Sequence, residues 1–106
     1  MSKYLFEASY TAEGIRGLQK GGAASRVTAI SDMCQQLGGS LDSFHFAFGD
    51  VDAFVICDLP DDTAAAAAAF TVGASSAATV VTTKLLTVEE ADAAISRSVT
   101  YRPPGS

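Results

Sequence analysis

Four short stretches of the chain are rich in aromatic and β-branched side chains. They are residues 3–10 (KYLFEASY), 40–48 (SLDSFHFAF), 53–59 (AFVICDL) and 78–87 (ATVVTTKLLT). Side chains of successive residues in such stretches alternate between two faces, which is typical of β-strands. The segment 49–52 (GDVD) predicts a turn, so the second and third strands are expected to pair as a hairpin.

The segments between these strands have helical spacing. After Thr11, which suits an N-cap, the sequence predicts a helix whose first half is irregular because it contains several glycines. Ser25 would restart this helix, and an apolar stripe at spacings of three and four residues follows until Gly38-Gly39 ends it. The stripe consists of Val27, Ile30, Cys34 and Leu37.

Two more helices are predicted in the second half of the chain. Pro60-Asp61-Asp62-Thr63 is typical of a helix start, and the alanine-rich segment that follows predicts a helix over about 62–72, ended by Gly73. Its small side chains would let it lie close to a sheet. Residues 87–90 (TVEE) match a capping box, which predicts a short helix to about residue 96.

The order of these elements is β-α-β-β-α-β with a short C-terminal helix. This predicts an α+β, ferredoxin-like domain with a four-stranded antiparallel sheet. We expect one domain over residues 1–97 and an extended C-terminal tail over 98–106.

A four-stranded sheet with two helices has only one covered face, yet the strands carry apolar side chains on both faces. In the first strand Tyr4, Phe6, Ala8 and Tyr10 would share one face, and Leu5 lies on the other. Large exposed apolar patches usually mark an interface. The simplest solution is a homodimer in which two sheets face each other as a dimeric α/β barrel.

Composition excludes several classes of function. The chain has a formal net charge of −5 and no basic cluster, so we expect it to bind neither nucleic acid nor a membrane. It has no apolar run of about 20 residues and no leader-like start, which predicts a cytoplasmic protein. Cys34 and Cys57 form no CxxC pair and are expected to be buried free thiols.

The chain resembles the GYD-domain family over about residues 3 to 90. The resemblance rests on the order and spacing of several short pieces: Tyr4, Ser9-Tyr10-Thr11, Glu13-Gly14-Ile15-Arg16, Gly38-Gly39, Gly49 with Asp52, Pro60-Asp61 and Thr87-Val88-Glu89-Glu90. It implies a dimeric α/β barrel and no particular reaction, since the wider superfamily includes cofactor-free monooxygenases, isomerases, haem enzymes and ligand-binding regulators. The family motif places a tyrosine beside the aspartate, whereas Val51 precedes Asp52 here.

His45 is the first candidate for chemistry, because it is the only histidine. If Phe44, Phe46 and Phe48 pack under the helices, His45 points to the opposite face of the sheet. It would then be a general base, a metal or haem ligand, or simply a hydrogen-bonded interface residue. Asp52 would orient this base or a substrate, although turn chemistry also explains Asp50 and Asp52.

Four further residues are candidates for ligand binding. Lys84 and Arg16 would bind an anion, with a solvated or ion-paired side chain as the alternative. Tyr4 and Tyr10 would line a pocket, with core or interface packing as the alternative.

Together these observations predict a small cofactor-independent enzyme, or an enzyme-like binder, for a small and mostly apolar organic molecule. The sequence indicates no cofactor and no metal. The alternative is a non-catalytic module for oligomerisation or ligand sensing, in which the polar residues only set register and specificity at the interface.

Overall fold

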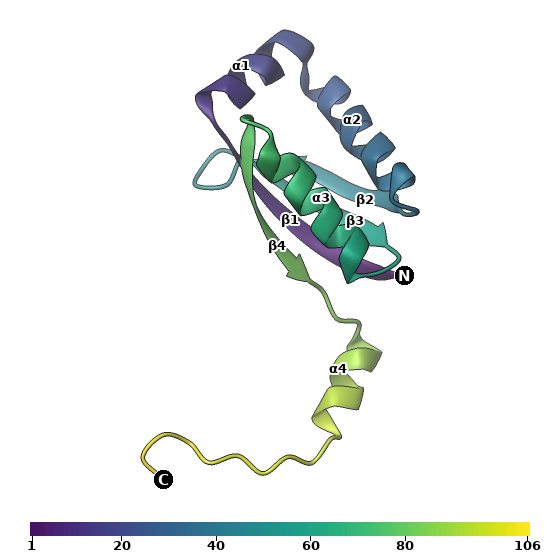
Figure 1. Cartoon of the computed structure of the whole chain (residues 1–106), viewed down its shortest axis with the longest axis vertical. Coiled ribbons are helices and arrows are strands. Elements are labelled where there is room, and N and C mark those ends of the chain that lie inside the picture. The colour runs from purple at the N-terminus through teal and green to yellow at the C-terminus, as the bar shows by residue number, and fades with distance from the viewer.

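The computed structural model describes residues 1–106, and it contains four strands and four helices. In chain order they are β1 (Ser2–Tyr10), α1 (Ala12–Gly21), α2 (Ala23–Gln36), β2 (Ser40–Phe46), β3 (Ala53–Leu59), α3 (Asp62–Ala74), β4 (Ala78–Lys84) and α4 (Val88–Ile95). This order confirms the predicted ferredoxin-like α+β fold, with the first helical segment divided into α1 and α2 (Figure 1).

The four strands form one antiparallel sheet in the order β2-β3-β1-β4. β1 and β3 are the central strands, and Phe6 pairs with Val55 on one side and with Thr82 on the other. Paired residues point to the same face, so the register fixes which side chains share a face.

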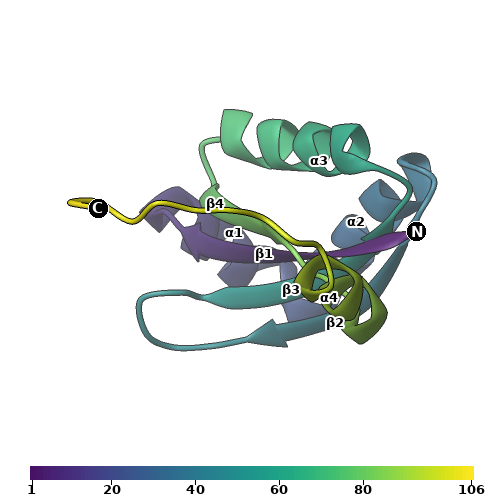
Figure 2. The ribbon, with the colours of Figure 1, turned by 90° about the horizontal axis from the view of Figure 1, so that it is seen from below.

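Helices α2 and α3 cover one face of the sheet, which we call the covered face, and leave the other, the open face, bare. Figure 2 shows α3 lying over one side of the sheet. The core lies beneath the helices, where Ile30 and Cys34 from α2 and three alanines of α3 meet the covered face. The buried residues of β1 and β3 alternate as predicted; they are Tyr4, Phe6, Ala8, Ala53, Val55, Cys57 and Leu59.

One prediction about β2 is wrong. Phe48 lies beyond the end of β2 and is fully exposed, so it does not pack under the helices, and Phe46 is 40% exposed. The register shifts by a bulge between Leu41 and Ser43. The extra residue brings Leu41 to the same face as Phe44 and Phe46, the opposite of strict alternation, because Leu41 pairs with Cys57 and Phe44 with Val55.

Glycines and partner strands set several element ends. The helical segment divides at Gly22, whose φ of 89° lies in the left-handed region, and Gly38 (φ 83°) follows the end of α2. Gly73 does not end α3, which continues to Ala74. β4 ends at Lys84, opposite Tyr4, rather than at 87; only the Leu85 N–H continues the contact, donating to the Lys3 carbonyl at 2.9 Å.

The C-terminal arm, which we define as residues 85–106, projects from the end of β4 away from the rest of the protein (Figure 1). No residue of α4 is buried, and Leu86, Val88 and Ile95 are exposed. The radius of gyration is therefore 16.8 Å, against about 13 Å for a compact chain of this length. No helix has both the length and the apolar character that a membrane crossing requires.

Candidate functional site

A small apolar cavity lies between the helices and the covered face, which we call the inner chamber. Its volume is about 40 Å³, and 11 of its 12 lining residues are hydrophobic. The lining residues are Phe6, Ala8, Tyr10, Arg26, Ile30, Met33, Phe44, Val55, Cys57, Ala68, Val72 and Val80. Arg26 is the only charged residue among them, so an otherwise apolar space has one cation in its lining.

A second, larger hollow lies where α1 and α2 meet, which we call the outer groove. Its volume is about 440 Å³, within the range of about 300–1,000 Å³ that small-molecule sites occupy. The space is open because three of its lining residues, Gly17, Gly21 and Gly22, have no side chain. A Cβ at Gly17 or Gly22 would meet no atom within 4 Å.

Tyr10 and Arg26 line both hollows and so mark the boundary between them. The guanidinium carbon of Arg26 lies 5.9 Å from the centre of the Tyr10 ring, a cation–π contact that holds the two side chains together. The buried Nε atom of Arg26 has no hydrogen-bond partner. None of the ion pairs of the chain involves Arg26 either.

Asp52 positions the end of β1 beside this boundary. Its carboxylate accepts a hydrogen bond from the backbone N–H of Tyr10 at 2.8 Å, and its own N–H donates to the Ala8 carbonyl at 2.9 Å. The loop between β2 and β3 is thereby fixed to β1, and Tyr10 is held over the covered face. In this arrangement Asp52 is a positioning residue of the loop.

Tyr4 and Lys84 meet at the other end of the covered face through Asp62. The Tyr4 hydroxyl donates to Asp62 at 2.6 Å, and the Lys84 ammonium lies 3.0 Å from the same carboxylate oxygen. The hydrogen bond from Tyr4, and then the one from Lys84, lowers the pKa of Asp62, while the bond to Asp62 raises the pKa of Tyr4. Lys84 is therefore already ion-paired, and neither residue lines either hollow.

His45 lies on the open face and is exposed. It pairs with Phe54, which pairs in turn with Glu7, and these side chains form one row across the sheet. His45 lines neither the inner chamber nor the outer groove. Arg16, on α1, is exposed and also lines neither of them.

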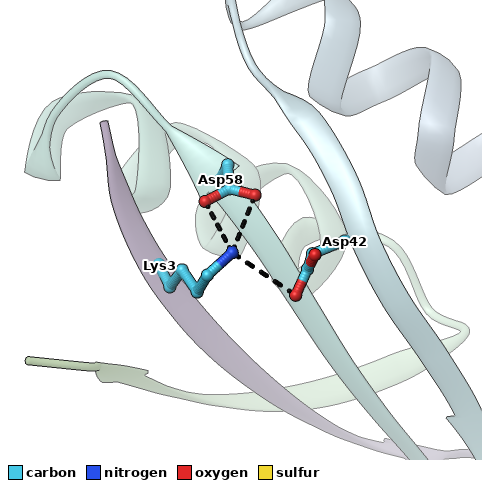
Figure 3. Close-up of polar contacts among 3 residues, drawn as sticks. All are labelled: Lys3, Asp42 and Asp58. Atoms are coloured by element: carbon cyan, nitrogen blue, oxygen red, sulfur yellow. Dashed lines mark hydrogen bonds and ion pairs between the residues drawn. The ribbon is translucent and has the colours of Figure 1, made fainter. Parts of the chain in front are cut away.

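The open face also carries a cluster of three charges. Figure 3 shows the Lys3 ammonium between two carboxylates, at 3.0 Å from Asp58 and 3.4 Å from Asp42. The three residues come from β1, β3 and β2, so the cluster joins three strands. The hydrogen bond to Asp58 raises the pKa of Lys3.

Two features of the covered side were not predicted. Arg26 is in phase with the apolar positions Ile30 and Met33, at spacings of four and seven residues, and a charge in that position was a usable signal. The thiols of Cys34 and Cys57 are free and buried, as predicted, but their Sγ atoms lie only 3.0 Å apart across the core. Their mutual hydrogen bond, together with burial, raises the pKa of Cys57.

No group of three or more His, Cys, Asp or Glu side chains is arranged to hold a metal ion. The sequence also matches the family description of the GYD domain over residues 4–95.

The chain belongs to the GYD domain family. Nearly the whole of this GYD domain, from β1 through α4, lies inside the matched region. Neither a search of curated proteins nor a search of solved structures found a match to it.

Proposed function

We propose that the protein is a cytoplasmic homodimer that binds a small, mostly apolar organic molecule without a cofactor. The observation that carries this proposal is the paired hollow on the covered side, an apolar chamber of about 40 Å³ beside an outer groove of about 440 Å³. Apolar walls with few polar groups at their edge are typical of small-molecule sites. The inner chamber fits this description, with Tyr10 and Arg26 as its polar groups, and Glu13 and Ser25 are further polar residues of the outer groove.

The open face supports self-association. Leu5, Phe54, Ile56 and Val81 lie on it, and Phe54 and Val81 are 38% and 63% exposed. Burial of apolar surface is worth about 25 cal/mol per Å², so a second copy facing this sheet would stabilise both protomers. The exposed apolar side chains of the C-terminal arm would gain partners in the same way.

In this proposal His45 is not a base that contacts the ligand. It lies beside Phe54 on the open face, which the second sheet would cover. Catalysis by His45 would need a space enclosed between the two sheets, whereas binding in the outer groove needs no contribution from it. The structure therefore favours an enzyme-like binder over an enzyme that uses His45.

NMR titration of the full chain with phenylacetate and with 2-phenylethanol tests this proposal. We expect at least one probe to bind and to shift signals of α1 and α2. Gly17→Leu should abolish binding, because its side chain would occupy the outer groove, whereas Gly73→Leu in α3 should not, since it too has open space around it but lines neither hollow. His45→Ala should bind normally.

If neither probe binds, the proposed binding function is contradicted. The alternative, a non-catalytic module for oligomerisation, would then remain. Light scattering of the same samples tests the dimer separately. A protomer mass at micromolar concentration would contradict the proposed dimer.

A further inference from the structure

We infer that the ligand of this site is a small monocarboxylate with an apolar tail, anchored by Arg26; this inference rests on the proposed binding function. The carboxylate would lie at the boundary of the two hollows, against the guanidinium. The tail would enter the inner chamber. A cavity of about 40 Å³ accepts roughly three water-sized groups, which suits a short alkyl chain or the edge of one ring.

The unpartnered guanidinium is the first reason for an anion. The Nε atom of Arg26 is buried without a hydrogen-bond partner, an arrangement that is unfavourable for a charged donor. A guanidinium presents several N–H donors in a planar fork that matches the two oxygens of a carboxylate. A ligand carboxylate would therefore supply the acceptor that the protein does not.

The surroundings hold this fork in place. Tyr10 stacks against Arg26 and is itself held by Asp52 through its backbone N–H. Arg26 also lies in the first turn of α2, whose N-cap Gly22 provides no side-chain hydrogen bond and whose first turn has no acidic residue. The free N–H groups and the dipole of that helix end favour negative charge on the same side. Gly22 and Ser25 line the outer groove there.

The charge balance favours one negative charge over several. Arg26 is the only cation that lines either hollow, and Glu13 lines the outer groove. A phosphate or a dicarboxylate would place additional negative charge near Glu13 and would leave the apolar chamber unused. A monocarboxylate with an apolar tail uses both hollows.

The test compares phenylacetate with 2-phenylethanol, which share the ring and differ in charge. The NMR signal of the Arg26 Nε–H group reports contact with the anion directly. We expect phenylacetate to bind at least about tenfold more tightly than the alcohol and to shift this signal, since a charge-assisted bidentate pair is the stronger kind of hydrogen bond.

Two substitutions sharpen the comparison. Arg26→Met should remove the preference for phenylacetate over the alcohol, while Arg26→Lys should retain part of the preference. Glu13→Gln should strengthen phenylacetate binding about two- to fivefold, because it removes a nearby like charge. Unchanged backbone amide spectra of each variant show that the fold is intact.

Each outcome has a distinct meaning. Equal affinity of the two probes, or a preference that survives Arg26→Met, overturns the carboxylate inference and leaves the proposed binding function standing. Inorganic phosphate that shifts the Arg26 signal as strongly as phenylacetate overturns the assignment to apolar monocarboxylates. If neither probe binds, the proposed binding function fails and this inference with it.

Discussion

The two faces of the sheet are built from the same strands, yet they differ in burial and in the side chains they carry. In β3 the residues Ala53, Val55, Cys57 and Leu59 are buried, while Phe54, Ile56 and Asp58 between them are not. The covered face is apolar and closed by α2 and α3, and the open face mixes apolar side chains with the Lys3 charge cluster. One face therefore stabilises the protomer through its core, while the other leaves apolar side chains such as Phe54 and Val81 exposed.

Replacement of one leucine on each face gives the largest contrast. Leu59→Ala on the covered face should lower the free energy of unfolding by about 2–5 kcal/mol, because Leu59 is completely buried and its loss leaves a cavity. Leu5→Ala on the open face should cost less, and its cost should grow with protein concentration if a second copy covers that face. Urea unfolding at several protein concentrations measures both.

If Leu59→Ala and Leu5→Ala lower the free energy of unfolding by the same amount at every protein concentration, this distinction between the faces is contradicted.

Two glycines of α1 differ in their surroundings: Gly14 is packed against Ala77, whereas Gly17 faces open space. Gly14→Ala should destabilise the protein by about 1–3 kcal/mol, because its Cβ would collide with the Ala77 carbonyl, which accepts the Thr11 N–H. Gly17→Ala faces open space and should stabilise the protein by about 1 kcal/mol through helix propensity. Thermal unfolding of the pair provides the measurement, and a gain in stability for both variants would show that α1 does not contact Ala77 as described.

The smallest expected effect concerns the polar cluster at the edge of the covered face. The pKa of Asp62 lies below its ordinary value of 3.8 because of its bonds from Tyr4 and Lys84. The resulting stabilisation is complete above pH 3.8 and is lost as the pH falls through the lower pKa of the folded state. Asp62→Asn should therefore make the free energy of unfolding depend less on pH in the acid range. Its dependence on pH near neutral pH should not change.

Urea unfolding between pH 2 and pH 5 measures this limb. Asp42→Asn, in the open-face cluster, is the matched control. If both variants weaken the pH dependence equally, the Tyr4–Asp62–Lys84 contact is not its specific source.

Local signals in the sequence were sufficient for most of the fold. Alternation in residues 3–10 and 53–59 assigned the faces of β1 and β3 correctly, and the capping box at Thr87 located the start of α4. These features depend on neighbours within a few residues, which the sequence displays directly. Strict alternation failed in β2, because a bulge depends on how β2 pairs with β3 and not on β2 alone.

The candidate site was less predictable than the fold. Of the predicted residues, Tyr10 lines both hollows and Asp52 holds its backbone N–H, whereas Tyr4 and Lys84 form a separate cluster and His45 lies on the open face. Arg26 was overlooked, since its importance comes from the partner it lacks. Pairing, or its absence, is decided by residues far away in the chain.

Local patterns in the sequence located the four strands, the N-terminal caps of α1, α3 and α4, and apolar side chains on both faces of the sheet, but not the start of α2 or the end of α3. Three features depend on packing between distant segments: Cys34 contacts Cys57, glycines of α1 leave a groove beside α2, and the Nε atom of Arg26 lies at its edge without an acceptor. The two groups of features differ in the distance along the chain over which their causes act. Backbone propensity and capping act over a few residues, whereas cavities and unsatisfied charges arise where distant segments pack together.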